Sequence, residues 1–206
     1  MKLYYAPGTC SMGIHVLLEE IGEPYEKELV SFPDGAQYKP PFSEMNPKSK
    51  VPVLLRDDGS VLTEFPAIAY WLARRHPAAG LLPDDPDAAA RAFEMVDYGV
   101  ATVHMQGFQR IARPKNFTPT EADLDAVKAR GREIFDRGLV LLDRGLGSHD
   151  YAVGDRLSIA DAALFYLCFW CRERLKGDLP DRLGALYDRL RERPAMQKVL
   201  QVEGFA

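Results

Sequence analysis

The segment KLYYAPGTCSMGIHVLLEEIG, residues 2–22, decides how the chain begins to fold. Residues 2–5 are predicted to form a β-strand, and residues 11–21 carry apolar side chains at helical spacing before Gly22 ends the helix. Cys10 lies in the turn between these two elements. The segment therefore predicts a strand that leads directly into a helix, with a cysteine at the N-terminus of that helix.

The residues that follow extend this beginning into one small domain. A second strand is predicted over residues 25–30, and a long polar loop with several prolines comes after it. Residues 51–55 and 60–62 flank an Asp-Asp-Gly hairpin signal, so we expect them to pair as antiparallel strands. A helix over about residues 66–75 completes the order βαβ followed by ββα.

The rest of the chain has a different character. Residues 78–86 are rich in Gly, Pro and Asp, and no strand pattern appears after them. The fold class is therefore α/β plus all-α: an α/β domain over residues 1–77, a linker over 78–86 and an all-helical domain over 87–206. Ser158 and Asp161 are spaced as a capping box at the start of an apolar helix. Apolar side chains recur at helical spacing in residues 87–113, 120–145, 158–175, 181–191 and 194–202.

Composition and charge argue against several classes of protein. The net charge of -4 gives no attraction to nucleic acid or to an anionic membrane. The N-terminus lacks the apolar run of a secretory signal, and the most apolar stretch, residues 162–171, is far shorter than a membrane span. Three cysteines fit a reducing compartment, so we expect a cytoplasmic protein. Cys168 and Cys171 lie within a predicted helix without further ligands, and we expect no metal site.

Cys10 is the first candidate for chemistry. The free N–H groups and the macrodipole of a helix N-terminus stabilise an anion, so we expect the pKa of the Cys10 thiol to be lowered. From position alone, a structural role is as well supported as a reactive one. The motif Cys10-Ser11-Met12-Gly13 lacks the second cysteine of a dithiol. A redox cycle at Cys10 would therefore need a thiol from outside the chain.

Two further positions have the chemistry of a peptide-binding site. The sequence Val51-Pro52 opens a strand, which suggests a cis bond and leaves the Val51 backbone free to pair with an extended peptide. Without its neighbours, an edge-strand proline with no ligand would be the simpler interpretation. Glu64 lies where a helix begins, so its carboxylate can hold a ligand ammonium group. Taken alone, Glu64 is more often a helix cap.

At these residues the chain resembles the glutathione S-transferases, and the bacterial class beta branch in particular, over essentially its whole length. The order and spacing of the shared motifs are specific. They are Lys2-Leu3-Tyr4-Tyr5 with Cys10-Ser11, Asn46-Pro47-Lys48, Val51-Pro52-Val53-Leu54, Leu62-Thr63-Glu64, Ala67-Ile68-Ala69-Tyr70-Trp71-Leu72, Ser158-Ile159-Ala160-Asp161 and Glu203-Gly204-Phe205.

The resemblance implies a thioredoxin-like domain that binds glutathione as co-substrate, a helical domain with an apolar pocket for hydrophobic electrophiles, and a homodimer. It also implies roles for single residues. Cys10, Ser11 and His104 would act in catalysis, Val51 and Pro52 would hold the cysteinyl backbone of glutathione, Glu64 and Phe65 would meet its γ-glutamyl end, Asp97 would reach the γ-glutamyl group from the neighbouring subunit, and Trp170 with Tyr5 would line the hydrophobic pocket.

One departure from the family pattern concerns the residue after Glu64. The family usually has a serine there, whose hydroxyl and N–H bind the γ-glutamyl carboxylate, but this chain has Phe65 followed by Pro66. Proline has no N–H, so the Phe65 N–H is the donor that remains. We therefore expect Phe65→Ser to tighten glutathione binding. The competing interpretation is that the phenyl ring packs in the core, in which case the same substitution costs stability.

Three functions are compatible with this sequence. The first is conjugation of glutathione to an electrophile, with Cys10 and Ser11 stabilising the glutathione thiolate. The second makes Cys10 the nucleophile that forms a mixed disulfide with glutathione and reduces disulfides or peroxides. The third is a non-catalytic binding or carrier module whose γ-glutamyl site Phe65 and Pro66 have altered.

Overall fold

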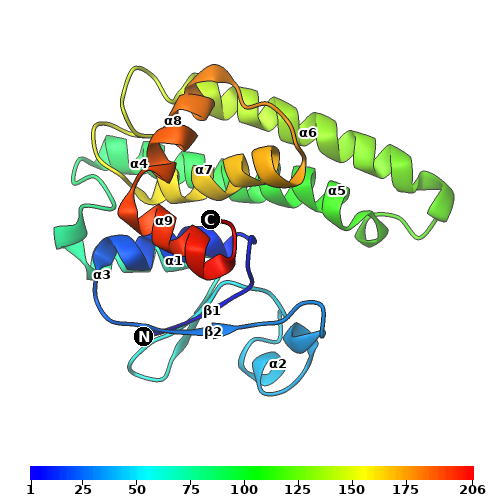
Figure 1. Ribbon diagram of the computed structural model, residues 1–206, viewed down its shortest axis with the longest axis horizontal. Helices are drawn as coiled ribbons and strands as arrows, with labels where there is room; N and C mark the ends of the chain where they lie inside the picture. Colours follow the sequence, from blue (N-terminus) through cyan, green and yellow to red (C-terminus); the bar gives the residue numbers. More distant parts are fainter.

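The computed structural model describes residues 1–206, which form a small sheet domain and a larger set of helices stacked on it (Figure 1). The sheet domain has the thioredoxin-like order that was predicted. Its strands are β1 (Lys2–Tyr5), β2 (Glu26–Leu29), β3 (Val53–Leu55) and β4 (Val61–Thr63). Its helices are α1 (Ser11–Ile21), α2 (Phe42–Met45) and α3 (Phe65–Arg75), with a short 3-10 turn, η1 (Ala36–Tyr38), before α2.

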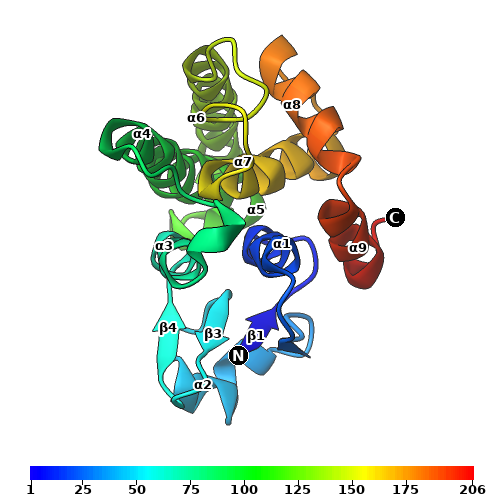
Figure 2. The ribbon, with the colours of Figure 1, turned by 90° about the vertical axis from the view of Figure 1, so that its left-hand side faces the viewer.

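The four strands pair in the order β2-β1-β3-β4. β1 runs parallel to β2, with Lys2 opposite Glu26, and antiparallel to β3, with Tyr4 opposite Val53. Because successive side chains of a strand point to opposite faces, β1 contributes side chains to two cores. Leu3 packs under α1 and α3, whereas Tyr4 packs against Phe42 of α2 on the other face. Figure 2 shows α1 and α3 side by side over one face of the sheet, with α2 on the opposite side.

The helical part contains no strand, as predicted, but two of its long helices change pitch. The segment predicted as one helix over 87–113 consists of α4 (Pro86–Asp97), a π-helical stretch η3 (Tyr98–Phe108) and α5 (Gln109–Ala112). The segment over 158–175 consists of α7 (Ile159–Phe169) and a second π-helical stretch, η6 (Trp170–Arg174). A spacing pattern cannot distinguish these pitches, and π-helical turns are frequent at functional sites.

The remaining helices complete the bundle around α7. They are α6 (Leu124–Gly145), α8 (Asp181–Arg191) and α9 (Pro194–Glu203), with short 3-10 turns η2 (Pro77–Ala79), η4 (Pro114–Asn116) and η5 (Glu121–Asp123). Every residue of α7 is buried. The predicted capping box is confirmed at its start, because the Ser158 side chain caps the helix and the Ser158 N–H donates to Asp161 at 2.8 Å. None of the helices is both long and apolar enough to cross a membrane.

Helix α1 joins the two parts of the molecule. It lies between the sheet and α7, and the C-terminal helix α9 lies along it in both views (Figures 1 and 2). Two ion pairs hold α9 there: Lys198 Nζ lies 2.7 Å from Glu19, and Arg193 binds Glu20 through two nitrogens. The end of the chain is thereby fixed against the helix that follows Cys10.

Candidate active site

The sulfur of Cys10 and the backbone of Val51 meet at the junction of β1, α1 and the loop before β3. The Cys10 thiol donates to the Val51 carbonyl at 3.5 Å. The Val51–Pro52 bond is cis, which confirms the sequence-based expectation. Asn46 shapes the loop, since its side-chain amide donates to the Lys50 carbonyl at 2.8 Å and its oxygen accepts from the Lys48 N–H. The backbone of Val51 is thus presented beside a thiol.

The expectation of a lowered pKa for Cys10 is wrong. Burial raises the pKa of the Cys10 thiol to about 12, and the nearby Glu64 carboxylate acts in the same direction. The N–H groups of Cys10 and Ser11 lower the pKa, but they do not outweigh burial. Thr9 explains part of the difference between the expected and the actual pKa. The Thr9 hydroxyl already accepts a hydrogen bond from the Ser11 N–H, and the Thr9 carbonyl accepts one from the Met12 N–H. Cys10 is therefore a neutral thiol.

The Ser11 side chain is fully buried and turned toward the loop that precedes it. Its hydroxyl donates to the Ala6 carbonyl at 3.2 Å, accepts from the Ala6 N–H at 3.2 Å and contacts the Thr9 hydroxyl at 2.8 Å. These bonds fix the turn between β1 and α1. The hydroxyl is thus engaged in holding the shape of the loop around Cys10.

Gly8, two residues before Cys10, is held by the helical part of the molecule on both sides of its backbone. Its N–H donates to Glu203 of α9 at 2.8 Å, and its carbonyl accepts from the Trp170 indole at 2.9 Å. The other Glu203 oxygen lies 2.9 Å from His15 Nδ1, and both side chains are buried. Gly8 has a φ of 65°, a backbone conformation that favours glycine, and a Cβ there would clash with two other side chains.

His104 lies on the π-helical stretch η3, where its side chain is buried. The Gln109 amide donates to His104 Nε2 at 3.1 Å, so Nε2 carries no proton and Nδ1 carries it. Burial, together with the charges of Lys50 and Arg113, lowers the pKa of His104 to about 3. His104 also meets the Trp170 ring edge-on, with 4.7 Å between centroids. A neutral imidazole is thus linked to the Cys10 loop through Trp170.

Trp170 and Tyr5, both expected in one apolar pocket, have different surroundings. Trp170 is stacked on Phe108 with 4.0 Å between ring centroids and is 2% exposed. Tyr5 is also buried, but it packs on His15 at 5.4 Å. Both side chains are therefore packed in the interior of the protein. Two surface cavities, of about 200 and 320 Å³, lie on the helical part, and neither is lined by these two residues.

Glu64 and Phe65 point in opposite directions. Glu64 has a φ of 72°, a strained conformation for a residue with a side chain, and its exposed carboxylate accepts from Lys48 Nζ at 2.8 Å. Phe65 is 3% exposed, and its ring meets Tyr166 of α7 edge-on at 5.4 Å. The Phe65 ring therefore belongs to the core, and Phe65 is the first residue of α3.

Asp97 lies apart from these residues. It is the last residue of α4, its side chain is exposed, and it makes neither a hydrogen bond nor an ion pair within the chain. No group of three or more His, Cys, Asp or Glu side chains is arranged to hold a metal ion.

Comparison with known proteins identifies the family. The family models for the N-terminal and C-terminal domains of glutathione S-transferase match residues 8–75 and 125–192. Glutathione S-transferase GstA of Escherichia coli O157:H7 is 33% identical, over 99% of both chains. The chain belongs to the glutathione S-transferase family. A glutathione transferase homolog from Sulfitobacter with bound glutathione has a TM-score of 0.91 at 27% identity, and covers 100% of this chain and 98% of its own.

A second solved structure supports the same assignment. The glutathione S-transferase of a sphingomonad, complexed with glutathione, has a TM-score of 0.84 at 32% identity, with full coverage of both chains. This transferase is therefore an enzyme with glutathione as co-substrate, and the non-catalytic carrier module is not favoured.

Sequence patterns missed several residues that shape the site of the transferase. Glu203 was noticed only as part of a family-like C-terminal ending, and no signal linked it to Gly8, 195 positions away. Tyr166 gave no signal at all, because an aromatic side chain at helical spacing is usually a core residue. Lys50 was also missed, although its position directly before Val51 and the cis proline was an available clue.

Proposed function

We propose that this transferase is of class beta and conjugates glutathione to small hydrophobic electrophiles, with Cys10 as a neutral hydrogen-bond donor to the glutathione sulfur. The observation that carries the proposal is the contact of 3.5 Å between the Cys10 sulfur and the Val51 carbonyl. A bacterial beta class glutathione S-transferase from Sphingomonas chungbukensis, 31% identical with a TM-score of 0.84, supports the class.

The same contact suggests how the thiol becomes available. An extended peptide that pairs with Val51 places its own N–H on the Val51 carbonyl. The cysteinyl N–H of glutathione would therefore replace the Cys10 thiol at that oxygen, and the Cys10 S–H would turn to the glutathione sulfur. A donor beside the sulfur stabilises its anion, which is the nucleophile in conjugation. Binding of glutathione thus makes the Cys10 S–H available as a hydrogen-bond donor to the glutathione thiolate.

The other residues of the site are assigned to the γ-glutamyl end of glutathione, to hydrogen-bond donation and to the shape of the site. Glu64 and the Phe65 N–H would hold the γ-glutamyl ammonium and carboxylate groups. The His104 Nδ1–H is buried without an acceptor, so we assign His104 the role of a neutral donor rather than a base. Ser11, Pro52, Tyr5 and Trp170 then act by shaping the site, since their side chains are packed.

The proposal is tested with retention on immobilised glutathione and with conjugation of chlorodinitrobenzene. We expect the wild-type protein to be retained and active. Cys10→Ala should keep retention and lose activity about tenfold or more, because a hydrogen bond to a charged group is worth roughly 1.5 to 3 kcal/mol. A wild-type protein that is neither retained nor active would refute the proposal.

A thiol-disulfide or peroxide reductase is the second candidate. It is supported by a free Cys10 next to the peptide-pairing backbone of Val51, and opposed by the raised pKa of the Cys10 thiol. Mass spectrometry after incubation with oxidised glutathione distinguishes the two functions. A mixed disulfide at Cys10 would favour the reductase, and an unmodified Cys10 would favour conjugation.

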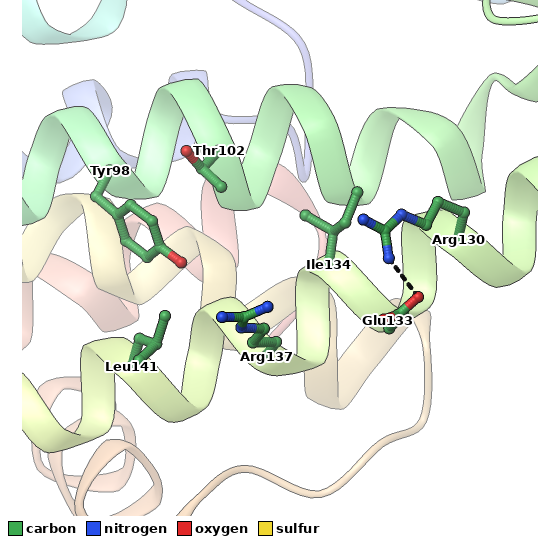
Figure 3. Close-up of a pocket in the computed structure, with 7 residues that line it drawn as sticks. All are labelled: Tyr98, Thr102, Arg130, Glu133, Ile134, Arg137 and Leu141. Atoms are coloured by element: carbon green, nitrogen blue, oxygen red, sulfur yellow. Dashed lines mark hydrogen bonds and ion pairs between the residues drawn. The ribbon is translucent and has the colours of Figure 1, made fainter.

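The partner that we propose is a second copy of the chain. A groove of about 200 Å³ lies between η3 and α6, with Tyr98 and Thr102 on one wall and Ile134 and Leu141 on the other (Figure 3). Leu141 and its neighbour Val140 are about 40% exposed. The unpaired Asp97 directly precedes Tyr98, so a partner docked on this groove would come close to Asp97.

The cellular compartment and the division into domains are also proposals. All three cysteines are free, which supports a reducing, cytoplasmic environment. We assign residues 1–77 to glutathione binding, 78–86 to a linker and 87–206 to the electrophile, consistent with the start of α4 at Pro86.

A further inference from the structure

Lys48 extends its side chain to the residues where α3 begins. Its Nζ donates to the Thr63 hydroxyl at 2.9 Å and to Glu64 Oε1 at 2.8 Å. A lysine ammonium group has three N–H donors, and the chain offers Lys48 no acceptor for the third. The side chain is 53% exposed. One N–H of Lys48 is therefore free for an acceptor that arrives from solvent.

The loop that carries Lys48 also presents the backbone of Val51. The Lys48 N–H donates to the side-chain oxygen of Asn46 at 3.2 Å, and Asn46 is 2% exposed. The amide of the same side chain donates to the Lys50 carbonyl at 2.8 Å, so Asn46 fixes both ends of the segment from Lys48 to Lys50. A peptide that pairs with Val51 is thus bound by the loop from which Lys48 reaches Glu64.

The charges of Lys48 and Glu64 match those of a free α-amino acid end. A γ-glutamyl group carries its ammonium and its carboxylate on one carbon atom. Lys48 occupies Oε1 of Glu64, whereas Oε2 has no hydrogen-bond partner in the chain. An ammonium group bound at Oε2 therefore brings its carboxylate within reach of the Lys48 ammonium group, where opposite charges attract.

The start of α3 offers that carboxylate few other donors. The N–H of Phe65, the first residue of the helix, has no acceptor in the chain, and Pro66 has no N–H. A carboxylate accepts several hydrogen bonds through its two oxygens, so one backbone donor satisfies only part of it. Lys48 supplies a second donor and a positive charge at the same place.

We propose that Lys48 is a binding residue for the γ-glutamyl carboxylate of glutathione, which takes the free Lys48 N–H together with the Phe65 N–H while the ammonium group binds Glu64 Oε2. This inference rests on the proposed placement of the γ-glutamyl end at Glu64. The pair of Lys48 and Glu64 thereby selects a ligand with both charges on one carbon atom.

Calorimetric titration with two probes tests the contact. The first is S-methylglutathione, which has no free thiol and is not consumed. The second has γ-aminobutyryl in place of γ-glutamyl and therefore lacks the carboxylate. Lys48→Met should bind S-methylglutathione about three- to tenfold more weakly than the wild type, and its affinity loss on removal of the carboxylate should be smaller by the same factor. An equal carboxylate effect in both proteins would overturn the inference.

A third probe distinguishes direct binding from an effect through Glu64. It has glutaryl in place of γ-glutamyl, so it keeps the carboxylate and lacks the ammonium group. If Lys48 merely holds Glu64 in place, Lys48→Met should weaken the effect of the ammonium group and leave that of the carboxylate unchanged, which would overturn the inference. Lys48→Arg keeps the positive charge and should keep the carboxylate effect of the wild type.

Lys39 provides a matched control in the same connection between β2 and β3. It is also exposed, and its Nζ donates to the Asp34 carbonyl at 2.6 Å. Lys39→Met removes the same charge and should bind all three probes with wild-type affinity. Equal losses in Lys39→Met and Lys48→Met would show a general effect of charge and overturn the inference. Melting curves establish that each variant is folded.

Conjugation is measured alongside binding, so the inference and the proposed function are judged separately. A protein whose carboxylate effect depends on Lys48 but which does not conjugate glutathione would support the inference and refute the proposed chemistry at Cys10. A protein that conjugates glutathione but has the same carboxylate effect with and without Lys48 would overturn the inference alone. A wild-type protein that does not bind S-methylglutathione would overturn both.

Discussion

The carboxylate of Glu203, three residues before the end of the chain, accepts a hydrogen bond from the Gly8 N–H at 2.8 Å. Its second oxygen lies 2.9 Å from Nδ1 of His15, on the buried face of α1. One side chain of α9 therefore ties together the loop before Cys10 and the helix after it. This makes the geometry at Cys10 depend on residues of the last helix.

Glu203→Ala should destabilise the protein and slow catalysis. Removing one partner of a buried charged contact costs about 3 to 5 kcal/mol, because the other polar groups are left unpaired. Glu203→Gln keeps an acceptor for Gly8 and should lose less. Glu192→Ala, on the exposed end of the preceding helix, is the control and should change stability by at most about 0.5 kcal/mol. Denaturant unfolding and kcat/KM measure both effects, and a fully stable Glu203→Ala would contradict this account.

The Cys10 thiol should titrate above the ordinary range of a cysteine. Burial raises its pKa to about 12, so the thiol stays protonated from neutral pH to beyond the free-cysteine value of about 8.5. The rate of alkylation by iodoacetamide should keep rising above pH 9, without a plateau. Cys10→Ser is the control, since it leaves only the buried Cys168 and Cys171. A plateau below pH 8 would show that the thiolate is stabilised after all.

His104→Ala should slow turnover with little change in glutathione affinity, because the imidazole lies against Trp170 rather than at the Glu64 end of the site. The exposed His149 is the control residue, and His149→Ala should leave both quantities unchanged. Steady-state kinetics with glutathione titration measures the two effects. If turnover in His104→Ala equals the wild-type value, His104 is a packing residue.

The low pKa of His104 also predicts a pH dependence of stability. The folded-state pKa of about 3 lies below the unfolded value of about 6.5, so in this window the unfolded chain binds the proton and the folded chain does not. The contribution of neutral His104 to the free energy of unfolding is therefore fully present above about pH 6.5, and it is lost as the pH falls toward 3. His104→Gln should unfold less steeply on acidification than the wild type, as judged by circular dichroism. Identical acid unfolding curves would argue against a buried neutral histidine.

Phe65→Ser should cost stability rather than tighten glutathione binding. The ring is 3% exposed and packs on Tyr166, and deleting a buried phenylalanine side chain costs about 3 to 5 kcal/mol. Phe117→Ser, at a ring that is 37% exposed, is the matched control and should cost little. Melting curves and calorimetric titration with glutathione measure the outcome. A well-folded Phe65→Ser with tenfold tighter binding would restore the importance of the missing hydroxyl.

The protein should sediment at twice the 23.1 kDa chain mass at micromolar concentration. Leu141→Arg places a charge at the groove between η3 and α6 and should shift the protein toward the monomer. Leu29→Arg, on the exposed edge strand β2, is the control and should stay dimeric. A wild-type monomer would refute the dimer, and a dimeric Leu141→Arg would move the interface to another face.

Most of the helices and strands, and the residues that act through their backbone, follow from local sequence signals. Local signals are sufficient for these: helical spacing and Gly22 gave α1 its bounds, the Asp-Gly turn gave the β3–β4 hairpin, and Pro52 marked the exposed backbone of Val51. Ser158 and Asp161 likewise identified the start of α7, because a capping box involves residues only three positions apart.

The behaviour of the side chains at the site depends on tertiary packing. Burial raises the pKa of Cys10, and the position of Cys10 at a helix N-terminus does not reveal that burial. The direction of the Phe65 ring depends on α7, about a hundred residues away, and the shape of the Gly8 loop depends on Glu203. Desolvation and close packing are set by segments distant in the chain, so a local pattern specifies where a side chain begins but not what surrounds it.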